Sequence, residues 1–74
     1  MYEIKLIYPK HKQYTPSNEY CESITHTAVI DLFLRGVHAH QSSATRIVLE
    51  SERDRTYALL LLSSNPQYTV VSVD

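Results

Sequence analysis

The sequence contains few of the residues on which small domains build special chemistry: its 74 residues include one glycine, one cysteine and no tryptophan. Having only Gly36 excludes the glycine-rich loops that cradle phosphates. Having only Cys21 excludes an internal disulfide framework and fits a reducing compartment. No apolar run approaches the roughly 20 residues that cross a bilayer, and the first residues lack the layout of a signal peptide. We therefore expect a cytoplasmic chain with no membrane partner.

The composition that remains is that of a globular protein. Hydrophobic residues make up 43% of the chain and charged residues 20%, which is too apolar for a disordered polyampholyte. The length allows a single domain over residues 1–74, and the net charge of −1 disfavours general affinity for nucleic acid. In so small a domain, apolar burial and the entropy of ordering nearly cancel, and association is a common way to add stability.

The first half of the chain predicts a strand, a long loop and a helix. Residues 2–8 alternate in the manner of a strand, and Pro9 ends it. Residues 9–22 show no apolar period and predict a long loop, which in a small domain is usually functional or mobile. Ser23 or Thr25 then caps a helix that continues through about Arg35, with Gly36 in the left-handed position and Val37 in contact with Leu32. This helix is apolar over most of its circumference, so we expect its burial to be deep or two-sided.

The second half predicts a three-stranded meander. Residues 44–51 alternate as a half-buried strand, residues 52–55 form a charged hairpin tip, and residues 56–62 form a second strand. Helix competes for the leucine run at 59–62, because it has no strand period. Residues 63–66 form a turn before a last strand at 68–73. The expected fold is α+β, in the order β-α-β-β-β, with one helix packed on one face of a mostly antiparallel sheet. The other face, with several tyrosines and leucines, is left open as a contact surface.

Two groups of residues could form a zinc site or a catalytic site, but simpler interpretations explain both groups better. Four potential zinc ligands match the spacing of no familiar zinc module, and solvated or capping histidines explain them better; they are Cys21, His26, His38 and His40. Cys21 beside a histidine could form a nucleophile and base, but a half-buried thiol is the simpler reading. We therefore expect no metal, no cofactor and no enzymatic activity.

Tyrosine and basic residues are the better candidates for a binding site. Six tyrosines are present, and tyrosine offers a large contact area with few torsions to order. For the three in or beside the long loop, a contact role and ordinary structural use weigh about evenly. Arginines at the hairpin tip could engage an acidic partner or simply be solvated. The candidate partner-binding residues are Tyr8, Lys10, Lys12, Tyr14, Tyr20, Arg53 and Arg55.

In length and element order the chain resembles small α+β accessory proteins of bacteriophages and mobile elements, including anti-CRISPR inhibitors. The resemblance rests on the strand at 1–8, the helix opening near 23–27 and the hairpin strands at 44–62. It implies inhibition by stoichiometric binding to a host protein complex. We therefore expect a non-enzymatic protein-binding module that contacts a host complex or a second copy of itself. The alternative is a nucleic-acid-binding regulator that uses the basic residues Lys10, Lys12, Arg46, Arg53 and Arg55.

Overall fold

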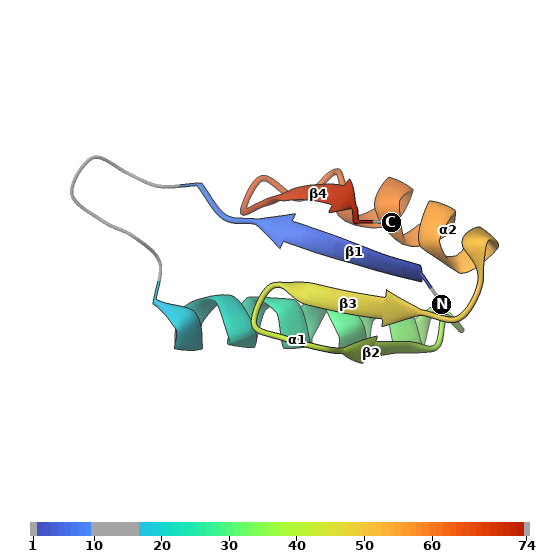
Figure 1. Cartoon of the computed structure of the whole chain (residues 1–74), viewed down its shortest axis with the longest axis horizontal. Helices are drawn as coiled ribbons and strands as arrows, with labels where there is room; N and C mark the ends of the chain where they lie inside the picture. Colours follow the sequence, from blue (N-terminus) through green and yellow to red (C-terminus); the bar gives the residue numbers. More distant parts are fainter. Residues whose placement is uncertain (1, 10–16, 74) are drawn as a thin grey trace.

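The computed structural model of the chain describes residues 2–9 and 17–73, which form two helices and four strands in one antiparallel sheet. In chain order the elements are β1 (Tyr2–Ile7), α1 (Asn18–Leu34), β2 (Ala39–Gln41), β3 (Arg46–Leu49), α2 (Glu52–Leu62) and β4 (Thr69–Ser72). The strand order across the sheet is β2-β3-β1-β4, with β1 between β3 and β4 (Figure 1). The α+β class is confirmed. The arrangement is that of the ferredoxin-like split β-α-β topology.

The sheet has one covered face and one open face. Alternate residues of β1 and β3 point to the covered face, where Ile4, Leu6, Ile47 and Leu49 are completely buried. The core that they form also contains residues of both helices, from α1 Ala28 and Leu32 and from α2 Ala58 and Leu62. Both helices therefore cover the same face, α1 over β2 and β3 and α2 over β1 and β4. The prediction that one sheet face stays open agrees with this arrangement.

The second helix corrects the largest error of the sequence prediction. Residues 52–62, predicted as a hairpin tip and a strand, form α2, so the order is β-α-β-β-α-β and no three-stranded meander exists among residues 44–73. Ser51 caps the helix by accepting a hydrogen bond from the Asp54 amide at 3.1 Å. Glu52 and Asp54 place negative charge in the first turn, where the helix dipole favours it. Because leucine is also a strong helix former, the run at 59–62 continues the helix.

Helix α1 starts earlier and is less buried than predicted. Its N-cap is Ser17, which accepts a hydrogen bond from the Tyr20 amide at 3.1 Å, so the predicted loop does not extend to residue 22. The buried residues of α1 are Cys21, Thr25, Ala28 and Leu32, on a single face of the helix. The expected two-sided burial is therefore wrong within the single chain: Ile30, Phe33 and Leu34 are exposed.

The end of α1 follows the prediction. Gly36 has a φ of 85°, the left-handed conformation that glycine adopts without strain. The Gly36 amide donates to the Phe33 carbonyl at 3.0 Å and the Val37 amide donates to the Leu32 carbonyl at 2.9 Å, which together form a Schellman cap. Val37 and Leu32 are both members of the core. This cap turns the chain directly into β2, a three-residue edge strand that the sequence did not predict.

Candidate functional site

The described tyrosines of the predicted binding set, Tyr8 and Tyr20, belong to one aromatic cluster. Tyr8 follows β1 and packs edge-to-face against Tyr20 at 6.4 Å and Tyr68 at 5.7 Å between ring centroids. Burial raises the pKa of Tyr8 to about 12, although the hydrogen bond with Thr25 acts in the opposite direction. Burial also raises the pKa of Tyr68. Tyr20 is 41% exposed and covers the edge of this cluster. Tyr68 is therefore part of the core, and Tyr8 is half-buried and packs against it.

The basic residues of the predicted set do not form a patch within the described part of the chain. Lys10, Lys12 and Tyr14 lie outside the described residues. Arg53 and Arg55 lie in the first half of α2 rather than at a hairpin tip. The Arg55 guanidinium lies 4.9 Å from the centre of the Tyr2 ring and 3.6 Å from Glu52 Oε1, so this side chain packs against β1. Arg53 is exposed.

The cysteine and the histidines do not gather into one cluster among the residues that the structure describes. Cys21 is buried in α1, and burial raises the pKa of its thiol. His26 and His40 are exposed, on α1 and β2, and the His38 ring packs edge-to-face on Phe33 at 6.1 Å. Within residues 2–9 and 17–73, no three His, Cys, Asp or Glu side chains gather into a group that could hold a metal ion.

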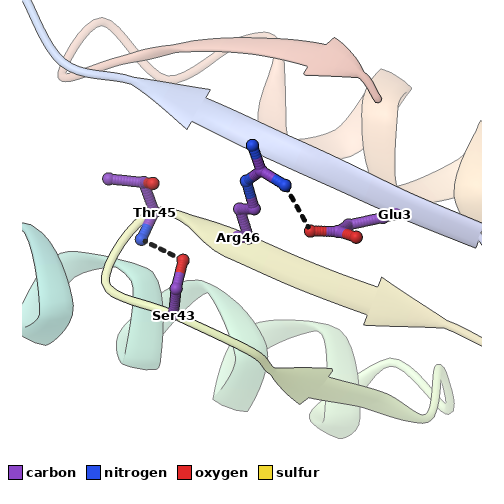
Figure 2. Close-up of polar contacts among 4 residues, drawn as sticks. All are labelled: Glu3, Ser43, Thr45 and Arg46. Carbon is purple, nitrogen blue, oxygen red and sulfur yellow. Dashed lines mark hydrogen bonds and ion pairs between the residues drawn. The ribbon is translucent and has the colours of Figure 1, made fainter. Parts of the chain in front are cut away.

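The open face of the sheet carries a mixture of charged and apolar side chains. Glu3 on β1 and Arg46 on β3 form an ion pair across the strands, 3.4 Å from Arg46 Nη1 to Glu3 Oε1 (Figure 2). Lys5 lies directly opposite Arg46 in the register. The turn that leads into β3 is held by the Thr45 amide, which donates to Ser43 Oγ at 3.3 Å (Figure 2). Alternation places Ile7, Val48 and Val71 on this same face, so its apolar area is interrupted by charge.

A groove lies between α1 and the end of α2, and the sequence analysis did not find it. We call it the helical groove. Its volume is about 710 Å³, and it is lined by Ile24, Thr27, Ala28, Ile30, Asp31, Leu34, Arg35, Leu61, Leu62, Ser64, Asn65, Pro66, Gln67 and Tyr68. The buried Ala28, Leu62 and Tyr68 belong to both the core and the groove lining. The groove is therefore an apolar depression with polar side chains around it.

The α1 side of the groove carries exposed apolar side chains. Leu34 is 76% exposed and Ile30, one turn earlier, is 46% exposed. Asp31 and Arg35 lie beside them and are also one turn apart, with 3.7 Å between Arg35 Nε and Asp31 Oδ1. We call these four residues the α1 stripe. A sequence signal for it existed in the apolar pair at i and i+4, but only the identification of α2 shows that a groove lies next to it.

Comparisons with known proteins give no relative for this chain. No protein-family model, no curated protein and no solved structure matches it. None of the helices in the described part of the chain is both long and apolar enough to span a membrane.

Proposed function

We propose that this chain is a non-enzymatic protein-binding module, and that the helical groove with the α1 stripe is its contact surface. The single observation that carries the proposal is the exposure of Leu34 and Ile30 at the edge of an apolar groove. Contiguous exposed apolar surface with a polar rim is typical of sites that bind other proteins. A partner would supply an amphipathic helix, whose apolar side chains fill the groove while its charges meet Asp31 and Arg35.

The state of the cysteine supports binding over catalysis. A catalytic cysteine reacts as the thiolate, and an accessible, electropositive surrounding normally stabilises that form. Cys21 is instead 7% exposed, and burial raises the pKa of its thiol. An unpaired buried thiol also fits the cytoplasm, where cysteines stay reduced. We propose that the module acts there by stoichiometric binding.

The resemblance to phage accessory proteins, which now rests on chain length, the first strand and the first helix because α2 replaces the hairpin expected at 44–62, extends this proposal to the class of partner. Inhibitors of that kind act by occupying a surface of a host protein complex. A groove that receives a helix would serve such a role, because it can cover a helix that the host complex needs for its own assembly. The proposed partner outside the chain itself is therefore a protein of a host complex.

The experiment is a comparison of two leucine substitutions in a capture assay. Leu34→Glu puts a charge on the α1 stripe, and Leu60→Glu puts the same charge on an equally exposed leucine that does not line the groove. Both sites tolerate a polar side chain because both are exposed. The proposal predicts that tagged wild-type chain and Leu60→Glu retain the same protein from a host lysate in a fixed molar ratio, and that Leu34→Glu loses it. Equal retention by both variants would contradict the proposal.

A second candidate, a nucleic-acid-binding regulator, is supported by the position of Lys5 opposite Arg46 on the open sheet face. Like charges on facing strands repel each other, and a phosphate between them would relieve the repulsion. Glu3 already neutralises part of this charge at 3.4 Å. For this candidate the affinity for single-stranded or duplex nucleic acid must fall as salt rises, and Arg46→Ala must reduce the slope of log affinity against log salt. Absence of binding at low salt would exclude it.

A further inference from the structure

The α1 stripe has a property that restricts what can cover it: it is complementary to itself. Ile30 and Leu34 form an apolar row, and Asp31 and Arg35 form a row of opposite charges on the groove side of it. Both rows repeat after four residues, one turn of helix, so each row has two members that can exchange places by a two-fold rotation.

Two antiparallel copies of α1 related by a two-fold axis use both rows at once. With the axis near the middle of the stripe, Ile30 of one copy opposes Leu34 of the other, and Asp31 approaches Arg35 of the other. A two-fold axis perpendicular to the plane of the two helices brings the same flank of each helix to the same side of that plane. The charged row of one copy therefore faces the charged row of the other, and the apolar row faces the apolar row. The two charged contacts and the two apolar contacts are then equivalent by symmetry.

The charged groups are placed to take part in such contacts. The side chains of Arg35 and Asp31 form an ion pair at 3.7 Å and are 49% and 48% exposed, so both charged groups remain accessible to a partner.

We propose that the partner at the α1 stripe is a second copy of this chain, which forms a two-fold symmetric dimer through antiparallel α1 helices. This inference rests on the proposed function, because it concerns the same surface: the second copy occupies it in the isolated protein, and a host helix that binds there would displace that copy. The copy closes the mouth of the helical groove and covers the apolar face of α1 that the single chain leaves exposed.

A mixing experiment with two charge variants tests the proposal. Asp31→Arg gives the stripe two positive charges, and Arg35→Asp gives it two negative charges. Either variant alone would place like charges across the axis, and we expect its dimer to be weaker than the wild-type dimer by on the order of tenfold or more. An equimolar mixture brings a positive stripe to a negative one, and a heterodimer must form with close to wild-type affinity.

The mixture separates contacts between chains from contacts within one chain. Both variants lose the Asp31–Arg35 pair within α1, and mixing does not restore it. Recovery in the mixture therefore reports only on the contact between copies. Sedimentation velocity measures the affinity, native mass spectrometry identifies the heterodimer by its mass, and circular dichroism checks that both variants are folded.

Three outcomes would overturn the proposal: a wild-type chain that is monomeric at high concentration, folded variants that dimerise as strongly as wild type, or a mixture that gives no heterodimer. The capture assay distinguishes this failure from failure of the proposed function. If the wild-type chain is monomeric but still retains a host protein through Leu34, the dimer proposal fails and the proposed protein-binding function stands. If the wild-type chain neither dimerises nor retains a host protein, both proposals fail.

Discussion

The Tyr8 hydroxyl and Thr25 Oγ1 lie 2.8 Å apart, and this contact joins the end of β1 to the middle of α1. Thr25 is completely buried, and its hydroxyl also donates to the Ala44 carbonyl at 2.7 Å. The Tyr8 hydroxyl also lies 3.2 Å from the Cys21 carbonyl. One buried hydroxyl thus fixes α1 to β1 and to the turn before β3, and so positions the α1 stripe relative to the sheet.

Thr25→Val tests the contribution of this hydroxyl. Valine has the same shape but leaves the Ala44 carbonyl without its partner, and we expect the free energy of unfolding to fall by about 1–3 kcal/mol. The control is Thr27→Val, whose hydroxyl donates to the Ser23 carbonyl at an exposed site. Urea denaturation measures both. Equal effects of the two substitutions would show that Thr25 has no special role.

The raised pKa of Tyr8 predicts a loss of stability at high pH. In the folded chain Tyr8 has a pKa of about 12, above its usual value of 10.0. Between these two values the folded state keeps the proton and the unfolded state loses it, so stability is complete below pH 10 and falls as pH rises toward 12. Tyr8→Phe must make the decline between these pH values less steep, and an unchanged decline would contradict this role of Tyr8. Thermal melts at a series of pH values give the answer.

Substitution of Gly36 tests the cap at the end of α1. A Cβ at this position would meet no atom within 4 Å, so the cost of Gly36→Ala is the conformational cost of a positive φ alone. We expect a loss of about 1–2 kcal/mol. Gly36→Asn should lose less, because asparagine adopts the left-handed conformation more readily. If alanine and asparagine are equally tolerated, the chain does not need the left-handed turn into β2.

The cap of α2 provides a test that separates the helix from the strand predicted by the sequence. Ser51→Ala removes the acceptor of the Asp54 amide, and we expect a loss of about 1 kcal/mol. Ser42→Ala, in the exposed turn after β2, is the matched control. If residues 52–55 formed the predicted hairpin tip, the two substitutions would have the same small effect. Chemical denaturation monitored by circular dichroism compares them.

The sequence predicted most of the elements whose signals are local. The alternation of Tyr2–Ile7, the glycine at the end of α1 and the alternation around Arg46–Leu49 each depend on a few neighbouring residues, and the structure confirms them. The region after Ser51 gave conflicting signals: a leucine run suits a buried strand and a helix equally, and the cap at Ser51 decided between them. A short edge strand such as Ala39–Gln41 has too few residues for a period to appear.

The candidate site was less predictable because it depends on which elements meet. Apolar residues around most of α1 were visible in the sequence, but whether those next to the groove are exposed depends on how α2 packs beside α1. Tyrosines looked like contact residues because of their chemistry, whereas Tyr8 and Tyr68 pack on each other within the fold. The chain does expose apolar side chains, as expected. The most exposed of them are on the helices rather than among the tyrosines, and include Ile30, Phe33, Leu34 and Leu60.

The size of the chain in solution, measured by sedimentation velocity over a concentration series, is the most direct test of the account. The wild-type chain and Leu60→Glu are predicted to form dimers as concentration rises, while Leu34→Glu stays monomeric and folded. A wild-type chain that remains a monomer, or a Leu34→Glu variant that dimerises as the wild type does, would contradict the claim that a second copy covers the α1 stripe.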